Sequence, residues 1–478
     1  MMAAWLTLLF SAYILQIVVI LLLEYRRQAH MTAWLFIVLL CPFVGFAAYM
    51  LLGSPYVKKR ARDRWQLECC EHLGEGRQTQ DSGDKIAISC EEEAYRQRLL
   101  HVLEKLSPFP LRVGNRGRVL TDGEATFDAI ETAMKRAEHH IHLDYYTIRH
   151  DSVGKRFLQT LTDKAREGVK VRVLYDGIGS MHLEQSFIEE LQRAGASTSC
   201  FSPAKGLLRG RLNYRNHRKI VVVDGVTGFL GGINIGDEYI GLDPKLGFWR
   251  DTHLQLTGEA VYDLQRLFMS DWRMATGESW QDLASYWPDQ SRPDKAGGEV
   301  IIVPGTPGME DQKIVEVLVA AISAATTRIY AATPYFIPDP AIAAALRIAA
   351  RTGVDVRLII PGRSDSRLVL LATLSHITDM LEAGVKVYRY GKGFIHSKVM
   401  IVDEMLASVG TANLDMRSFY SNYELLALLF DKALISRLEN DFMQDLQNSA
   451  KVDADAFSAR SRKQKLAEAV MHIVSPLL

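Results

Sequence analysis

The sequence predicts an α/β protein with two similar α/β domains that meet at a pseudo-two-fold interface, preceded by an α-helical transmembrane hairpin. Three observations support this prediction: an uncharged apolar N-terminus, a helix–strand alternation that occurs twice, and a short motif present once in each repeat. The 478 residues are enough for about two to four domains, and the 48% apolar content can fill sizeable cores.

Residues 1–57 predict a two-helix transmembrane anchor. Met1–Leu23 and Met31–Val57 contain no charged residue, and about 20 apolar residues cross a bilayer as a helix. A cleaved signal peptide would need a basic start and a small-residue cleavage site, which are both absent. The basic flank at 58–64 predicts, by the positive-inside rule, a multi-pass protein of the cell (cytoplasmic) membrane with its catalytic domains in the cytoplasm.

Residues 58–110 are expected to be a linker, residues 111–290 a first domain and residues 291–478 a second. In each domain two helical segments alternate with two strands, which is typical of layered α/β structure. The predicted elements of the first domain are helices Phe127–His140 and Val153–Gly168 and strands Ile141–Ile148 and Val169–Tyr175. Those of the second are helices Gln312–Thr327 and Pro340–Gly353 and strands Arg328–Phe336 and Val354–Pro361.

Charge and cysteine content narrow the function classes. Lys+Arg and Asp+Glu are both 56, so the net charge is zero, whereas nucleic-acid-binding enzymes more often have a basic excess. The five cysteines fit neither a disulfide framework nor a zinc site, so we expect free thiols in a reducing compartment.

The strongest functional signal is the motif His-x-Lys-x-x-x-x-Asp, which occurs twice. An asparagine follows each histidine by 17 residues, and an acidic residue follows each asparagine. The first copy contains His217, Lys219, Asp224, Asn234 and Asp251, and the second contains His396, Lys398, Asp403, Asn413 and Glu424.

Strand geometry separates the roles of these residues. Histidine and lysine share one face of a strand, about 7 Å apart. The aspartate has the opposite parity and begins a turn in Asp224-Gly225, so Asp224 and Asp403 are expected to be mainly structural. A two-residue turn would pair Val223 with Val226, and would place a small residue opposite each histidine, with room for a phosphate.

Two histidines suit displacement at phosphorus. One can attack and form a phosphohistidine, while the other protonates the leaving alcohol from the opposite side. The lysines add positive charge, and Asn234 and Asn413 can donate hydrogen bonds to phosphate oxygens. Asp251 and Glu424 are candidates to orient the imidazoles.

The paired motifs resemble those of the phospholipase D superfamily, and several flanking phrases resemble bacterial cardiolipin synthases. These phrases are Asn213–Lys219, Gly231–Tyr239, Trp249–His253, Thr333–Pro338 and Asn413–Phe419. The resemblance covers nearly the whole chain. It implies two phospholipase D-like domains around one active site, with the motif residues catalytic and His217 as nucleophile.

The same resemblance implies a phosphatidyltransferase that joins two phosphatidylglycerol molecules into cardiolipin and releases glycerol. It implies phosphatidylglycerol in the membrane as the partner, no nucleic acid, and no metal or organic cofactor. Homo-oligomerisation stays open.

Other functions remain compatible with the sequence: a phospholipase or another phosphatidyltransferase, a superfamily nuclease, and a non-enzymatic membrane scaffold. The neutral charge and the membrane hairpin argue against the nuclease, and two complete motifs argue against the scaffold. His139, His140 and His142 superficially suggest a metal site, but they lie where a helix runs into a strand and their side chains should diverge. The segment 460–478 predicts a packed terminal helix in preference to an interfacial one.

Overall fold

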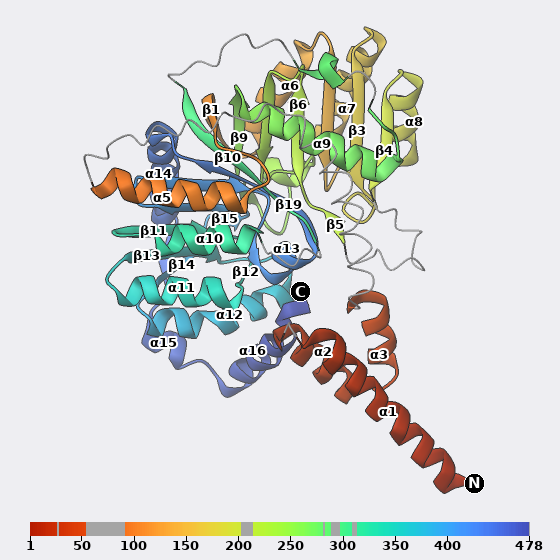
Figure 1. Cartoon of the computed structure of the whole chain (residues 1–478), viewed down its shortest axis with the longest axis vertical. Helices are drawn as coiled ribbons and strands as arrows, with labels where there is room; N and C mark the ends of the chain where they lie inside the picture. Colours follow the sequence, from red (N-terminus) through yellow and green to blue (C-terminus); the bar gives the residue numbers. More distant parts are fainter. Residues whose placement is uncertain are drawn as a thin grey trace.

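The computed structural model describes residues 1–25, 28–53, 91–201, 214–280, 283–287, 297–307 and 313–477. Its body is built on one 16-stranded sheet that runs through both halves of the chain (Figure 1). The α/β alternation expected from the sequence is therefore confirmed.

The first half extends from the start of the sheet to residue 287. Its elements are β1 (Arg112–Thr121), α6 (Gly123–Lys135), β2 (His140–Tyr145), α7 (Ser152–Arg166), β3 (Lys170–Asp176), α8 (Gln185–Arg193), β4 (Ser197–Phe201), β5 (Arg215–Asn216), β6 (Lys219–Val223), β7 (Thr227–Gly231), η3 (Asp237–Ile240), β8 (Phe248–Arg250), β9 (Thr252–Thr257), α9 (Ala260–Thr276) and η4 (Leu283–Tyr286).

The second half repeats this order and adds a C-terminal helical segment. Its elements are β10 (Gly298–Gly305), α10 (Lys313–Ser323), β11 (Arg328–Ala332), β12 (Phe336–Ile337), α11 (Pro340–Arg351), β13 (Asp355–Pro361), α12 (Arg367–Glu382), β14 (Lys386–Tyr390), β15 (Gly393–Ile395), β16 (Val399–Val402), β17 (Leu406–Gly410), β18 (Leu414–Asp415), α13 (Met416–Tyr420), β19 (Asn422–Leu429), α14 (Lys432–Gln447), β20 (Ser449–Lys451), α15 (Ala454–Ser458), α16 (Arg462–Val474) and η5 (Ser475–Leu477).

The two halves have the same strand order. It is β1-β9-β7-β6-β2-β3-β4 in the first half and β10-β19-β17-β16-β11-β13-β14 in the second. The halves join where β1 pairs antiparallel with β10, with Arg112 opposite Val300. An antiparallel pair of equivalent strands is what a two-fold relation between the halves requires, so the predicted pseudo-symmetry is confirmed.

Helices cover both faces of the sheet and divide the apolar core. In the first half, Phe127 of α6 and Phe157 of α7 pack on one face. On the other face, Leu264 of α9 and Phe442 of α14 belong to one core cluster that includes strands from both halves. This shared core joins the two repeats into one body and fixes their relative position.

One short strand from each half pairs with a strand of the other half. β5, immediately before the first motif, pairs with β19, and β15, immediately before the second motif, pairs with β8. The backbone N–H of His217 then donates to the carbonyl oxygen of Tyr423 at 2.9 Å, and that of His396 donates to Arg250 at 2.7 Å. Each motif histidine is therefore anchored to the opposite half.

The turn after each motif differs from the expected register. Asp224 and Gly225 both have positive φ, and the N–H of Val226 donates to the carbonyl oxygen of Val223, as the predicted turn requires. The strands, however, pair Val223 with Thr227, so one further residue bulges out of the ladder. The expected pairing of Val223 with Val226 is wrong by one residue.

The aspartates of the motifs connect these turns to the preceding helix–strand junctions. Asp224 accepts hydrogen bonds from three successive backbone N–H groups, at residues 138–140. Asp403 accepts from the N–H groups of Thr326, Thr327 and Arg328 and from both threonine hydroxyls. Both side chains thus satisfy backbone N–H groups at the junction between a helix and the following strand.

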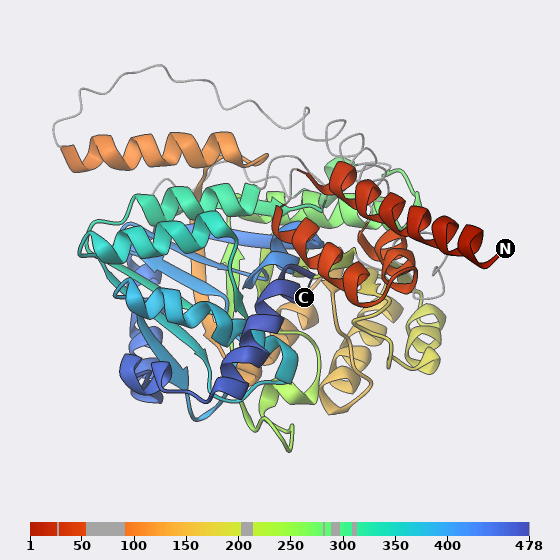
Figure 2. The same cartoon turned by 90° about the horizontal axis from the view of Figure 1, so that it is seen from below.

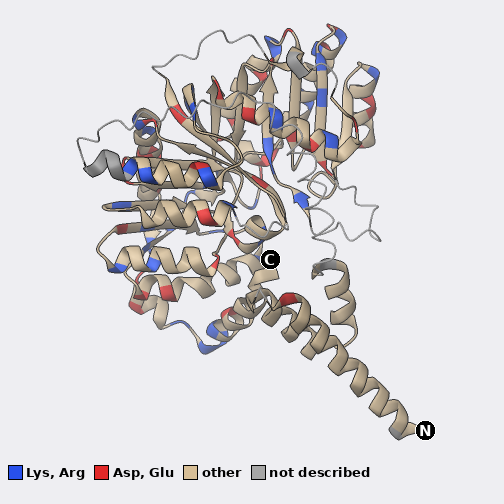
Figure 3. Cartoon of the chain, in the orientation of Figure 1, with Lys and Arg blue, Asp and Glu red and all other residues tan. Residues whose placement is uncertain are grey.

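The N-terminal segment contains one long apolar helix that projects from the body (Figures 1 and 2). α1 (Met2–Glu24) is long and apolar enough to cross a membrane, with a mean hydropathy of 2.6 over its candidate span. Along α1, Figure 3 shows acidic or basic colour only at the end near the body. This helix agrees with the first of the two expected spans.

The second expected span is not a continuous helix. α2 (Gln28–Leu40) has 13 residues, about 20 Å of helix against a bilayer core of about 30 Å. Pro42 cannot continue a helix, and Phe43 has φ of 63°. The chain then forms only the short turns α3 (Val44–Ala48) and η1 (Tyr49–Gly53), and the last four residues of the expected span lie outside the described part.

Two further segments tie the ends of the chain to the body. α5 (Glu91–Leu106) forms a helix within the expected linker 58–110 and packs against α10; residues 58–90 lie outside the described part. α16 packs against α12 and α2, and Leu477 packs against the buried core of the N-terminal helices.

Cys41 and Cys200 are free thiols, and the other three cysteines lie outside the described residues.

We expect Asp403→Asn to lower the midpoint of thermal unfolding. Charge-assisted hydrogen bonds would be lost, which should cost about 1–2 kcal/mol at this half-buried position. Burial raises the pKa of Asp403, but hydrogen bonds from Thr327 and the neighbouring backbone outweigh it and hold the pKa below its usual value of 3.8. The stabilisation should therefore be complete above the unfolded-state pKa and be lost as pH falls through the lower folded-state value.

The matched control is Glu404→Gln in the same turn, where the side chain is 75% exposed. Thermal unfolding of both purified variants at pH 7 and near pH 3 measures the difference. Equal midpoints for the Asp403 variant and the unaltered protein at pH 7 would show that this carboxylate does not stabilise the turn.

Candidate active site

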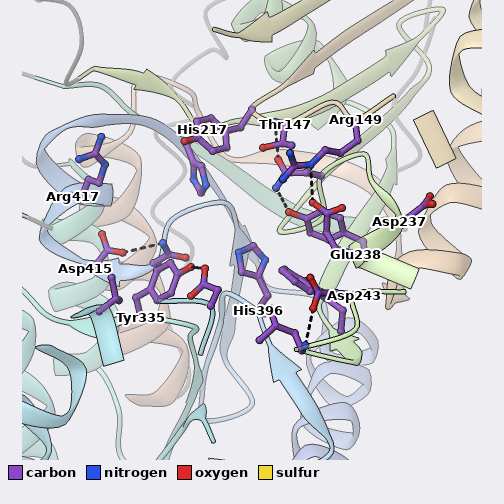
Figure 4. A pocket seen from close by; sticks show the side chains of 18 of the residues that line it. Thr147, Arg149, His217, Asp237, Glu238, Asp243, Tyr335, His396, Asp415 and Arg417 are labelled. Carbon is purple, nitrogen blue, oxygen red and sulfur yellow. Dashed lines mark hydrogen bonds and ion pairs between the residues drawn. The ribbon is translucent and has the colours of Figure 1, made fainter. Parts of the chain in front are cut away.

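The two motif histidines face one cavity between the halves. His217 lies between β5 and β6, and His396 between β15 and β16, so each ring is held by a strand on either side. Both line a cavity of about 690 Å³, together with residues from both halves. Figure 4 shows the two imidazoles approaching each other across it. The structure therefore brings together the two motifs that are 179 positions apart in the sequence.

Each imidazole is oriented by a carboxylate of the other half. Nδ1 of His217 lies 3.0 Å from both carboxylate oxygens of Glu424. Nδ1 of His396 lies 2.7 Å from Oδ2 of Asp251. A carboxylate accepts a hydrogen bond from Nδ1–H, so this contact leaves Nε2 as the nitrogen that can react. The sequence identified both acids but not this crossed pairing.

The small residues near the histidines make room for these carboxylates. A Cβ atom on Gly232 would lie 2.1 Å from Oδ1 of Asp251. At the equivalent position, the hydroxyl of Thr411 donates to Oε2 of Glu424 at 2.6 Å. The space that was expected to admit a phosphate is therefore taken by the orienting acid in both copies.

Lys219 and Lys398 are buried beside the histidines. Nζ of Lys219 donates to the carbonyl oxygen of His217 at 2.7 Å, and Nζ of Lys398 to that of His396 at 2.5 Å. Nζ of Lys398 also lies 2.8 Å from Nδ1 of His396, but that nitrogen gives its proton to Asp251. Both ammonium groups are thus held by carbonyl oxygens next to the cavity.

Burial shifts the protonation of this cluster. It lowers the pKa of Lys219 to about 7 and that of Lys398 to about 8, although nearby carboxylates oppose the effect. Burial likewise lowers the pKa of His217 to about 4. It would raise the pKa of Glu424, but His217 and Lys219 outweigh it and lower that pKa to about 2. At neutral pH the site therefore contains a neutral His217 beside an ionised Glu424.

The asparagines also line the cavity. Oδ1 of Asn234 accepts a hydrogen bond from the N–H of Thr147, and its Nδ2 donates to the hydroxyl of Tyr239. Nδ2 of Asn413 donates to Asp415 at 2.9 Å. Each amide nitrogen has two hydrogens, so one N–H per asparagine can still be directed at a substrate oxygen. Asp224 and Asp403, by contrast, do not line this cavity.

Aromatic side chains surround the imidazoles, and the sequence analysis did not identify them. The ring of Tyr146 contacts His217 edge-on, with centroids 4.9 Å apart. Trp249 lies 5.3 Å from His396. Tyr335 and Arg417 also line the cavity. Trp249 and Tyr335 both lie within the flanking phrases that carry the family resemblance. Those phrases did not indicate which of their residues face the site.

Among the described residues, no group of three or more His, Cys, Asp or Glu is arranged to hold a metal ion. The clustered histidines of β2 are tied to a neutral partner instead. Oε1 of Gln265 lies 2.8 Å from Nε2 of His140, and Nε2 of Gln265 lies 2.7 Å from Nδ1 of His142. This bridge accounts for two of the three histidines that had suggested a metal.

The fold has a counterpart among solved structures. The crystal structure of phosphatidylserine synthase from Haemophilus influenzae superposes with a TM-score of 0.60 and covers 78% of this chain and 96% of its own. The two sequences are only 14% identical, so this similarity concerns the fold.

Sequence relatives are much closer. Cardiolipin synthase of Geobacillus kaustophilus is 41% identical over 98% of this chain and 93% of its own length. Cardiolipin synthase 2 of Bacillus anthracis is 41% identical over 98% of this chain and 90% of its own. Residues 130–272 and 318–446 match the family described as cardiolipin synthase, PLD-like domain. The chain belongs to the phospholipase D-like cardiolipin synthase family.

Proposed function

We propose that this protein transfers the phosphatidyl group of one phosphatidylglycerol to a second, giving cardiolipin and glycerol. The observation that carries the proposal is the pair of imidazoles on one cavity, each oriented by a carboxylate of the opposite half. This arrangement provides a nucleophile and an acid/base on opposite sides of a phosphorus atom, as in-line displacement requires.

In the first step, Nε2 of His217 attacks the phosphorus of the donor lipid. The bond between phosphorus and the headgroup oxygen breaks, and His396, which is protonated on Nε2 when the donor lipid is bound, gives that proton to the oxygen, so glycerol leaves. The phosphatidyl group is then held on His217 through a P–N bond. His217 suits the role of nucleophile because burial lowers its pKa to about 4 and keeps the ring neutral.

In the second step, a hydroxyl of the acceptor phosphatidylglycerol enters from the side that glycerol left. His396 takes the hydroxyl proton, the oxygen forms a bond to phosphorus, and the P–N bond breaks. Cardiolipin is released and both histidines return to their starting states. Lys219 and Lys398 stabilise the charge on the phosphoryl oxygens in both steps. Asn234 and Asn413 donate further hydrogen bonds to those oxygens.

We infer from the proposed intermediate that rapid denaturation in detergent at neutral pH during turnover traps phosphatidyl-His217, because its P–N bond is labile in acid. The purified full chain would be mixed with phosphatidylglycerol vesicles, quenched, digested and examined by mass spectrometry. His217→Ala should give no adduct and no cardiolipin. His396→Ala should lose turnover by about 100-fold or more, since it removes general acid–base catalysis. An adduct on His396 in the unaltered protein would reverse the assigned roles.

The same intermediate could react with water, which would make the protein a phospholipase. We expect cardiolipin and glycerol in about equal amounts from vesicles of phosphatidylglycerol, with phosphatidic acid minor, because a positioned hydroxyl has an effective molarity of roughly 10⁵ M or more. Thin-layer and mass-spectrometric product analysis measures the ratio. Predominant phosphatidic acid would establish hydrolysis as the main activity and contradict the synthase proposal.

Location in the membrane follows from the anchor. We infer that α1 crosses the membrane while α2 stays on the side of the body, because α2 packs against α16 and is too short to span. Arg26, Arg27 and the basic residues at 58–64 would then lie on one side, which the positive-inside rule assigns to the cytoplasm.

This topology predicts that the catalytic body is protected in intact cells. External protease should leave the body intact and should digest it only after permeabilisation, as followed with a C-terminal epitope. Digestion of the body in sealed cells would place the catalytic domains outside.

A further inference from the structure

The cavity that His396 lines is rich in carboxylates. Five described acidic residues line the cavity: Asp237, Glu238, Asp243, Asp365 and Asp415. A phosphodiester substrate is itself anionic, so carboxylates here are not explained by phosphate binding. These carboxylates need another kind of hydrogen-bond donor, and the free hydroxyl groups of a lipid headgroup are one.

Four of these carboxylates already have strong protein donors. Asp237 accepts from the backbone and hydroxyl of Ser152, and Asp243 from the N–H groups of Lys245 and Leu246. Glu238 pairs with Arg149 at 3.2 Å. These interactions fix loops at the rim of the cavity.

Asp415, the fourth, accepts from the amide of Asn413 and the N–H of Ser418. Asp365 differs from all four, because the hydrogen bonds that it accepts within the described part of the chain come from hydroxyls. The hydroxyl of Tyr335 donates to Oδ2 at 2.5 Å, and that of Ser364 to Oδ1 at 3.3 Å. A substrate hydroxyl can replace or join a hydroxyl donor without breaking backbone structure.

Asp365 and Tyr335 also lie on the correct side of the reaction. Tyr335 and His396 line the same cavity (Figure 4). Burial and the two lysines lower the pKa of His396, and the negative charge of Asp365 opposes that lowering. In the proposed reaction the departing glycerol and the entering hydroxyl both occupy the side of the phosphorus nearest His396. The groups beside His396 therefore contact the alcohol.

We propose that Asp365 and Tyr335 form a pair that selects the alcohol by binding the free hydroxyls of its glycerol unit. The carboxylate accepts from one hydroxyl, and the phenol can donate to or accept from its neighbour. The pair distinguishes a polyol from a simple alcohol and from water. This inference rests on the proposed transfer reaction and names the specificity determinant of the same site.

The test is a competition between two small alcohols for one intermediate. Purified full chain is reconstituted with phosphatidylglycerol vesicles containing equal concentrations of isotope-labelled glycerol and propan-1-ol. Attack by glycerol on phosphatidyl-His217 gives labelled phosphatidylglycerol, and attack by propan-1-ol gives phosphatidylpropanol. In each case the P–N bond breaks and the hydroxyl proton passes to His396. The product ratio is independent of how fast the intermediate forms.

The unaltered protein should prefer glycerol. Asp365→Asn should lower the ratio about 10- to 100-fold, the range expected when hydrogen bonds to a charged group are lost, and Tyr335→Phe about 3- to 10-fold. Asp379→Asn is the matched control, since it removes a carboxylate that is 61% exposed on α12 and does not line the cavity. Its ratio should not change.

An unchanged ratio in both variants, with alcohol transfer still occurring, would overturn this inference and leave the proposed function standing. A second competition with ethanolamine replaces propan-1-ol by a cationic alcohol. If Asp365→Asn reduces the use of ethanolamine but not of glycerol, the carboxylate recognises a cation and the inference is also overturned. Phosphatidic acid as the sole product of the unaltered protein would instead refute the proposed function itself.

Discussion

The hydrogen bond between each motif histidine and a carboxylate of the opposite half is the constraint on which the site depends. It exists because the strand before each motif leaves its own half, with β5 pairing with β19 and β15 with β8. The residue between the histidine and the lysine of each motif makes further contacts with the opposite half. Arg218 donates to the carbonyl oxygens of Glu424 and Gly305, and the hydroxyls of Ser397 and Thr252 lie 3.0 Å apart. Neither half therefore contains a complete catalytic unit, and function requires the shared core that holds them together.

Burial of charge explains how phosphate binding and lysine protonation are coupled. Two lysines lie beside two orienting carboxylates, and His217 stays neutral next to them. Desolvation lowers the pKa of each lysine toward neutrality, so the ammonium form is only weakly favoured without substrate. A phosphodiester bound beside the lysines adds a negative charge that favours their protonated form. Phosphate binding and lysine protonation should therefore be mutually reinforcing.

The sequence predicted the elements of the fold well because their signals are local. Helical and strand periodicities placed α6, β2, α7 and β3, and again α10, β11, α11 and β13, within a few residues. Because the motif repeats, the sequence also identified the two histidines and two asparagines that line one cavity, while their catalytic roles stay predictions. The prediction failed where a single residue determines the local structure. A bulged residue at Val226 shifted the hairpin register, and Pro42 with Phe43 broke the expected second span. The sequence could not predict that each histidine is oriented by the acid of the opposite half, because each acid follows the motif of its own half along the chain.

The two halves share a backbone, yet their side chains differ where roles must differ. In the first half a glycine at 232 admits the short acid Asp251, and in the second Thr411 binds the longer acid Glu424. Glu424 also accepts a hydrogen bond from Asn422, and its lowered pKa keeps the carboxylate ionised. An ionised partner suits a nucleophilic imidazole that must remain in one tautomer. The cavity that His396 lines also contains Tyr335 and Asp365, a carboxylate that accepts hydrogen bonds from two hydroxyls. Duplication thus supplies the two opposed imidazoles that in-line transfer needs. In the proposed reaction, divergence of a few neighbours directs one imidazole to phosphorus and the other to the alcohol.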